Sequence, residues 1–256
     1  MFFNQPIPAL TPTLTDSRDT LFADPASDRG LFTFDEDVAR VFPDMIKRSV
    51  PGYPTIISMT GLLAGKYAIA DSNLYDLGCS LGASTLAMRH AIRQTGCRII
   101  AVDNSPDMLQ RCRSIIETDT HETPVDRHCA NLQDVAVANA SVVILNFTLQ
   151  FIPPGQRDQV ISGIYAGMQP GGILVLSEKL SFNDKRLDDL NIELHHQFKR
   201  ANGYSDLEVA AKRTALETVL VPETLQQHRH RLASAGFSSC DVWFQCFNFA
   251  SLVALK

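Results

Sequence analysis

Close cysteine pairs are missing from this chain of 256 residues. Its six cysteines stand at positions 79, 97, 112, 129, 240 and 246, form no C-x-x-C pair, and lie mostly in or beside apolar runs. That usage is typical of reduced, mostly buried thiols, so we expect a cytoplasmic protein. No group of cysteines, histidines and carboxylates has the spacing of metal ligands, and we therefore expect no metal cofactor.

Two further features are absent: an apolar run of membrane-spanning length and an excess of basic charge. The first residues, Met1-Phe2-Phe3, lead into prolines without the basic start and long apolar stretch of a signal peptide. The formal net charge is −5, with 20% charged residues, so the surface as a whole does not attract polyanions. We expect no membrane partner and no direct binding of nucleic acid.

A glycine-containing motif, Asp76-Leu77-Gly78-Cys79-Ser80-Leu81-Gly82, follows a short β-like run. Gly78 and Gly82 can turn a strand sharply into a helix, here Ala83 to Ile92, whose first N–H groups favour a bound carboxylate. Such a turn alone is common wherever a helix packs on a strand. Asp103, which ends the next apolar strand, can accept both hydroxyls of a ribose, and the pair predicts a nucleoside-cofactor site.

Short β runs then alternate with helical ones, which predicts a parallel sheet with helices on both faces. The expected strands are Leu74 to Leu77, Ile99 to Val102, Val125 to Cys129, Val142 to Phe147 and Ile173 to Leu176, with Pro170-Gly171-Gly172 ending the helix before the last of them. Two later runs, Asp241 to Cys246 and Phe249 to Leu255, must pair as an antiparallel hairpin. This is an α/β fold, a Rossmann-like mixed sheet with an antiparallel last strand, as in class I S-adenosylmethionine-dependent methyltransferases.

Composition also divides the chain. Residues 1–30 mix proline, threonine and aspartate without periodicity, and we expect a flexible N-terminal arm that docks only in part. Residues 31–256 are expected to form one catalytic domain, which begins with two helices separated by Pro51-Gly52. A charged helical insertion at about 180–221 interrupts the alternation and is placed to cover the site.

Several long runs together resemble the carboxy-S-adenosyl-L-methionine synthase family, within the class I methyltransferase-like superfamily. They are V-F-P-D-M-I-K-R-S-V-P-G-Y (41–53), Y-D-L-G-C-S-L-G (75–82), V-D-N-S-P (102–106), L-N-F-T-L-Q-F (145–151), F-K-R-A-N-G-Y-S (198–205) and W-F-Q-C-F-N-F (243–249). The likeness extends from about Asp19 to Lys256.

The resemblance implies an enzyme that converts S-adenosyl-L-methionine and prephenate into carboxy-S-adenosyl-L-methionine, phenylpyruvate and water. The product would supply a tRNA carboxymethyltransferase that makes the oxyacetate modification of the wobble uridine. The implied base is the hydroxide that leaves prephenate, so no protein nucleophile is required. A homodimer is also implied.

The same resemblance assigns site residues. It places Tyr53, Gly78, Cys79 and Ser80 on the methionine and adenosyl parts of the cofactor, Asp103 and Asn104 on the ribose and adenine edge, Asn131 and Leu132 on adenine, and Asn146 beside the sulfonium. Asn131 departs from the expected aspartate, although an amide oxygen can still accept from the adenine amino group. Arg213 would pair with the new carboxylate of the product, and Arg213 and Tyr53 are the implied catalytic residues.

Alternatives remain at several positions. Lys212-Arg213 can be part of a solvated helical face, and His195-His196 favour surface or packing roles because adjacent helical side chains point about 100° apart. The aromatic residues from Trp243 to Phe249 favour the core. From the residues alone, an ordinary S-adenosylmethionine methyltransferase or a non-enzymatic protein that binds this cofactor stays open.

Overall fold

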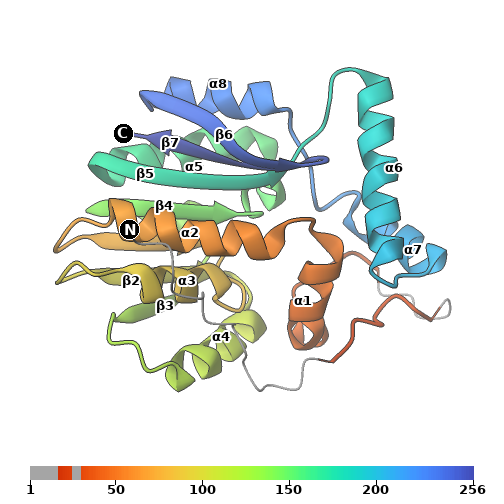
Figure 1. Ribbon diagram of the computed structural model, residues 1–256, viewed down its shortest axis with the longest axis horizontal. Coiled ribbons are helices and arrows are strands. Elements are labelled where there is room, and N and C mark those ends of the chain that lie inside the picture. Colours follow the sequence, from red (N-terminus) through yellow and green to blue (C-terminus); the bar gives the residue numbers. More distant parts are fainter. Residues whose placement is uncertain (1–16, 25–29) are drawn as a thin grey trace, which may run out of the picture.

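A seven-stranded mixed sheet forms the centre of the molecule in the computed structural model, which describes residues 17–24 and 30–256 (Figure 1). The strand order is β3-β2-β1-β4-β5-β7-β6, in which β1 to β5 are parallel and β7 runs antiparallel to both of its neighbours. The strands are β1 (Asn73–Leu77), β2 (Arg98–Asp103), β3 (Val125–Cys129), β4 (Ala140–Asn146), β5 (Met168–Lys179), β6 (Ser239–Cys246) and β7 (Phe249–Leu255). The predicted fold class and the late hairpin are confirmed.

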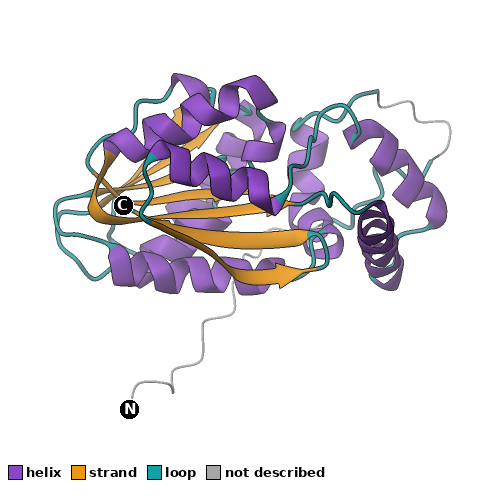
Figure 2. Ribbon diagram, turned by 90° about the horizontal axis from the view of Figure 1, so that it is seen from above, coloured by secondary structure: helices purple, strands orange, loops and turns teal. Residues whose placement is uncertain are grey.

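Helices cover both faces of this sheet (Figure 2). They are α1 (Glu36–Ser49), α2 (Tyr53–Tyr67), α3 (Ala83–Ala91), α4 (Pro106–Thr118), α5 (Pro154–Gly167), α6 (Lys185–Ala201), α7 (Asp206–Leu216) and α8 (Leu225–Ala235), with short 3-10 turns η1 (Leu132–Asp134) and η2 (Leu149–Phe151). Alternate residues of each strand point to opposite faces. Leu74 and Ile144 therefore pack under α2 and α3, whereas Tyr75 and Leu145 pack under α5 and α8.

The end of α5 differs from the prediction. Pro170-Gly171-Gly172 does not end that helix, because α5 already ends at Gly167 and β5 begins at Met168. Met168 pairs with Ala140, and the register of β4 and β5 shifts before Val142 pairs with Ile173. The proline and the two glycines thus lie in the irregular first part of a strand, a position that tolerates a missing donor and a positive φ.

The charged segment after β5 folds into α6 and α7, which stand together beyond the carboxyl ends of the parallel strands (Figure 1). A capping box starts α7: Ser205 Oγ accepts from the backbone N–H of Glu208, and the Glu208 carboxylate accepts from the N–H of Ser205. Because α6 and α7 lie beyond the carboxyl ends of the parallel strands, they stand at the edge of the sheet where ligands of open α/β folds bind.

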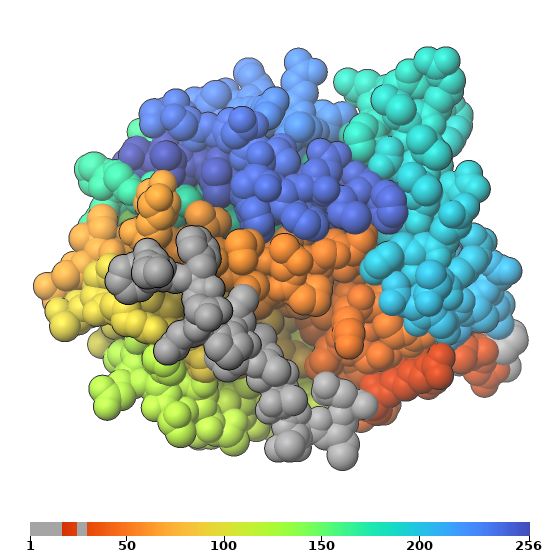
Figure 3. Space-filling view, viewed as in Figure 1, coloured from red at the N-terminus to blue at the C-terminus, as the bar shows by residue number. Residues whose placement is uncertain are grey.

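The described part of the N-terminal segment, residues 17–24, packs against α7, and Figure 3 shows its red atoms beside the cyan ones of that helix. Asp19 is 1% exposed, and its carboxylate accepts from Lys212 Nζ at 2.6 Å and from the Tyr204 hydroxyl at 2.5 Å. Arg48 Nη1 also donates to the carbonyl of Asp19 at 3.1 Å. Residues 1–16 and 25–29 of the predicted arm lie outside the described residues.

Candidate active site

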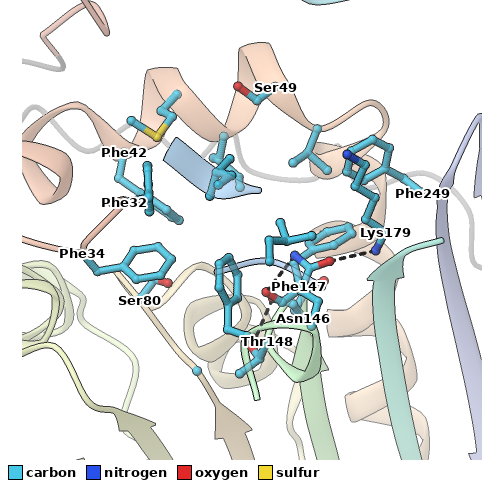
Figure 4. Close-up of a pocket in the computed structure, with 18 of the residues that line it drawn as sticks. Phe32, Phe34, Phe42, Ser49, Ser80, Asn146, Phe147, Thr148, Lys179 and Phe249 are labelled. Carbon is cyan, nitrogen blue, oxygen red and sulfur yellow. Dashed lines mark hydrogen bonds between the residues drawn. The ribbon is translucent and has the colours of Figure 1, made fainter. Parts of the chain in front are cut away.

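A cavity of about 430 Å³ opens at the carboxyl ends of β1, β2, β4 and β5 and is closed over by α1, α6 and α7. Nine of the ten residues assigned from the sequence line it: Tyr53, Gly78, Cys79, Ser80, Asp103, Asn104, Leu132, Asn146 and Arg213. Asn131 does not, although its neighbours Ala130 and Leu132 do. Figure 4 shows Ser80 and Phe34 on one side of the cavity and Lys179 and Phe249 on the other.

The strand-to-helix turn at Gly78 has a shape that a side chain would destroy. Gly78 has φ of +83°, and a Cβ there would lie 2.3 Å from Thr148 Oγ1. The backbone N–H groups of Gly78 and Cys79 both donate to the carbonyl of Val102, which holds the turn against β2. The turn leads into α3 through Gly82, so the free N–H groups of the first helical turn face the cavity end of the sheet.

Asp103 connects this turn to β2. Its Oδ2 accepts from the backbone N–H of Ser80 at 2.8 Å, and its Oδ1 accepts from that of Ser105 at 2.9 Å. Burial raises the pKa of the Asp103 carboxyl, while the backbone N–H groups oppose that rise. A carboxylate has about four acceptor positions, so Asp103 can still accept from two hydroxyl groups.

Asp76, the first residue of the motif, supports the turn from below and does not line the cavity. It is 1% exposed, and Thr85 Oγ1 on α3 donates to its Oδ2 at 2.6 Å. Burial raises the pKa of Asp76 to about 6. Tyr53, the first residue of α2, also lines the cavity. Burial, then the charge of Asp76, raises the pKa of its hydroxyl, which keeps it a hydrogen-bond donor.

The turn after β4 presents an unsatisfied acceptor. Asn146 Nδ2 donates to Ser84 Oγ at 3.2 Å, whereas the buried Oδ1 has no hydrogen-bond partner among the described residues. Phe147, which follows, has φ of +60°, and Glu178 fixes the next turn by accepting from the N–H groups of Leu149 and Gln150, each at 2.9 Å. An orphaned oxygen in a cavity wall is suited to a ligand that carries a donor or a positive charge.

Comparison with known proteins identifies the chain. A methyltransferase-domain family matches residues 74–172. The chain is 59% identical over 244 residues to the carboxy-S-adenosyl-L-methionine synthase of Citrifermentans bemidjiense, which covers 95% of this chain and 100% of that protein. The protein of the same name from Vibrio cholerae is 56% identical over 239 residues, 93% of this chain and 97% of the relative. The chain belongs to the carboxy-S-adenosyl-L-methionine synthase family.

Solved structures that are similar to this member of the synthase family confirm its fold. A putative S-adenosylmethionine-dependent methyltransferase from Methanococcus maripaludis superposes with a TM-score of 0.59 and 16% identity, covering 90% of this chain and 97% of the other. Human N-acetylserotonin methyltransferase, solved in complex with SAM, gives a TM-score of 0.57 at 18% identity, over 86% of this chain and 55% of the other. The fold is thus that of class I S-adenosylmethionine-dependent methyltransferases.

The cradle fits the cofactor that the family name contains. The Gly78 turn provides a close backbone approach, and the first turn of α3 provides N–H donors suited to a carboxylate. The Asp103 carboxylate provides acceptors suited to a ribose, and Asn146 adds a free oxygen acceptor in the cavity wall. We call this lining the sheet-edge half of the cavity. Its residues are Tyr53, Gly78, Cys79, Ser80, Asp103, Asn104, Leu132 and Asn146.

Asn131 is the one assigned residue that does not line the cavity. It is exposed, its Oδ1 accepts from Asn104 Nδ2 at 3.3 Å, and its Nδ2 donates to Asp134 Oδ2 at 3.2 Å. Contact between Asn131 and adenine therefore stays a prediction for this member of the synthase family.

The opposite lining, which we call the helical half, is cationic and was mostly missed in the sequence. It includes Lys179 from the end of β5, Ile192, His195, His196 and Lys199 from α6, and Lys212, Arg213 and Leu216 from α7, with one carboxylate, Glu217, directly after that helix. The α6 residues stand at positions i, i+3, i+4 and i+7, so they share one face of the helix. That spacing was visible in the sequence, but an inward stripe is normally recognised by apolar residues, and this one is mostly basic.

His195 is buried, whereas its neighbour His196 is only partly buried. His195 is 5% exposed, stacks edge-on to Phe249 with ring centroids 4.8 Å apart, and places Nε2 2.8 Å from the carbonyl of Ser49. Burial, then the charges of Lys199 and Lys179, lower the pKa of His195 to about 2, so the ring is neutral. The packing interpretation of His195 and of Phe249 is thus confirmed, although both residues also line the cavity.

Residues 17–24 and 30–256 contain neither a candidate metal site nor a helix suited to span a membrane. No cluster of at least three histidine, cysteine, aspartate or glutamate side chains in these ranges could hold a metal ion. No helix there combines the length and the apolar character that a membrane crossing requires.

Proposed function

We propose that this protein synthesises carboxy-S-adenosyl-L-methionine from S-adenosyl-L-methionine and prephenate. The observation that carries the proposal is the union of two unlike linings in one cavity: a nucleoside cradle and a wall of cations. A methyl donor alone gives no reason for that wall, whereas a carboxylated product and a co-substrate with two carboxylates do. Arg213 would pair with the carboxylate added to the methyl group, since its guanidinium can bind both oxygens at once.

The atoms balance without a catalytic nucleophile from the chain. Prephenate loses its ring carboxyl as carbon dioxide, its ring becomes aromatic, and the ring hydroxyl leaves as hydroxide. The hydroxide takes one proton from the S-methyl group and becomes water, and the methyl carbon forms its new bond to carbon dioxide. The task of the cavity is therefore to hold both substrates together and to exclude bulk water.

We further propose residues 31–256 as a single catalytic domain, a homodimer in the cytoplasm, and a tRNA carboxymethyltransferase as the enzyme that uses the product on the wobble uridine. The net charge of −5 supports a protein that makes the small-molecule donor and leaves tRNA binding to that second enzyme.

Mass spectrometry of the small molecule released from purified protein tests the reaction. Because the product carries two carboxylates held by charge-assisted hydrogen bonds, we expect it to co-purify, and its isotope-labelled form should appear when labelled prephenate is added. Recovery of S-adenosylhomocysteine alone would favour a methyltransferase. Bound S-adenosylmethionine that never turns over would favour a binding protein.

A further inference from the structure

Three cations of the helical half have no ion-pair partner among the described residues. Within residues 17–24 and 30–256, no carboxylate lies within ion-pair distance of the ammonium groups of Lys179 and Lys199 or of the Arg213 guanidinium. Lys212 differs, because the buried carboxylate of Asp19 lies 2.6 Å from its Nζ. Of these four basic side chains, three thus have no ion-pair partner in the described part of the chain, and Lys212 is neutralised by Asp19.

Lys199 is the most informative of the three. It is 6% exposed, lines the cavity, and lies one helical turn after His195, which packs against Phe249. Burying an ammonium group without a partner is expensive, and the neighbouring positive charges of Lys212 and Lys179 add to that expense. A position that only needed to fill space would hold an uncharged side chain more stably.

The cations differ in how deeply they are buried. Arg213 is exposed on α7 at the rim of the cavity, whereas Lys199 is buried on α6 and Lys179 extends into the cavity beside Phe249 (Figure 4). The methionine carboxylate of the cofactor has its own donors at the start of α3. One guanidinium is enough for the carboxylate that is transferred. Lys199 and Lys179 are then left for another carboxylate.

We infer that Lys199 and Lys179 form a second carboxylate subsite, which holds the carboxylate that the co-substrate keeps, while Arg213 holds the carboxylate that it loses. This inference rests on the proposed function. In prephenate the retained group is the carboxylate of the pyruvyl side chain, which leaves in phenylpyruvate. The rings of Phe249 and Phe147, with centroids 5.9 Å apart, supply an apolar wall next to Lys179 for the six-membered ring.

The two products allow the subsites to be tested separately: of the two carboxylates of prephenate, phenylpyruvate carries only the retained one and carboxy-S-adenosylmethionine only the transferred one. Lys199→Met should raise the inhibition constant of phenylpyruvate and the KM of prephenate about tenfold or more, as expected for a lost hydrogen bond between charged groups. Its dissociation constant for carboxy-S-adenosylmethionine should stay within about twofold. Arg213→Ala should raise the dissociation constant for carboxy-S-adenosylmethionine and the KM of prephenate, and leave the inhibition constant of phenylpyruvate within about twofold.

Lys47→Met, on the exposed part of α1, is the matched control and should change none of these three constants. Lys199→Arg, which keeps the charge, should restore part of the lost phenylpyruvate affinity. A Lys199→Met protein that makes the carboxylated cofactor with an unchanged KM for prephenate would overturn the subsite and leave the proposed function standing. A wild-type protein that makes no carboxylated cofactor from prephenate would overturn the proposed function itself.

Discussion

The sheet-edge half and the helical half of the cavity bind by different means. In the sheet-edge half, a glycine turn and backbone N–H groups define the shape, and the one carboxylate, Asp103, already accepts from Ser80 and Ser105. In the helical half, long side chains on α6 and α7 form the lining, and several of their charged groups have no ion-pair partner in the described chain. Backbone geometry that belongs to the fold can hold the cofactor, whereas an additional anionic substrate must be bound by charged side chains that are specific to this sequence.

The largest effect is expected from a substitution in the sheet-edge half. Gly78→Ala should cost about 2 to 5 kcal/mol, shared between folding and S-adenosylmethionine binding, because a Cβ would meet Thr148 and the positive φ disfavours alanine. Urea denaturation and calorimetry measure the two shares. Gly163→Ala on α5 is the matched control, since nothing lies within 4 Å of a Cβ there. Wild-type binding by Gly78→Ala would show that the turn does not hold the cofactor.

Arg213→Ala tests the helical half. It should lose about 2 to 4 kcal/mol of affinity for carboxy-S-adenosylmethionine, through the lost paired hydrogen bonds and the anion left without a partner, and far less for S-adenosylmethionine. Arg113→Ala, exposed on α4, serves as the control in the same titrations. Equal losses for both ligands would make Arg213 a general support of the pocket. An unchanged affinity for both ligands would support the alternative interpretation, in which Arg213 belongs to a solvated helix face.

Asp103→Ala should weaken both cofactor forms alike, by about 1.5 to 3 kcal/mol, since the ribose is common to them. The substitution also leaves the N–H groups of Ser80 and Ser105 without their acceptor, so Asp103→Asn, which keeps one carbonyl oxygen, should lose less. Calorimetry with both ligands measures the difference. An unchanged affinity of Asp103→Ala would remove this residue from the site.

The pH dependence of phenylpyruvate inhibition tests the role of charge in the helical half. Burial, then the charges of Lys212 and Lys179, lower the pKa of Lys199 to about 7, while Asp19 opposes the shift. Below that pH the ammonium group is charged and ready for an anion; above it, binding must first take up a proton. The inhibition constant should therefore rise with pH above 7, by up to about tenfold per unit.

Other groups that face Lys199 also titrate. The pKa of Lys179 is lowered by burial and by Arg213, and the pKa of His196 is lowered by burial and by Lys199. Lys199→Arg, which stays charged, isolates the contribution of Lys199 and should flatten the profile between pH 7 and 9. A profile that is equally steep in Lys199→Arg would assign the dependence to one of the other groups.

The smallest effect is expected at Cys79, within the sheet-edge half. Its thiol is buried against Cys112, and that contact, together with burial, raises the pKa of Cys79 well above its usual range, the reverse of what a nucleophile needs. Cys79→Ala should keep most of the activity, because the backbone of the turn is unchanged. Complete loss with normal folding and normal cofactor binding would reveal covalent chemistry.

The sequence predicted these two halves unequally, for a physical reason. Gly78, Asp103 and the strands around them follow from local rules on turns, strand ends and alternation, and these rules placed the sheet within a few residues. The early end of α5 was missed because Pro170 and the glycines after it occupy an irregular strand start, where local rules and sheet pairing disagree. Lys179 and Lys199 could not be assigned, because only the tertiary fold brings these two lysines, 20 positions apart in the sequence, into the lining of the same cavity.

The Asp19–Lys212 ion pair joins residues that are 193 positions apart in the chain. During synthesis on a ribosome, α7 therefore emerges long after the segment that must cover it, and the wall beside Arg213 closes only at a late stage of folding. A chain shortened to begin after Asp19 would carry a fourth unpaired cation in the cavity and would behave as an electrostatic variant of the active site, with all of α7 still present.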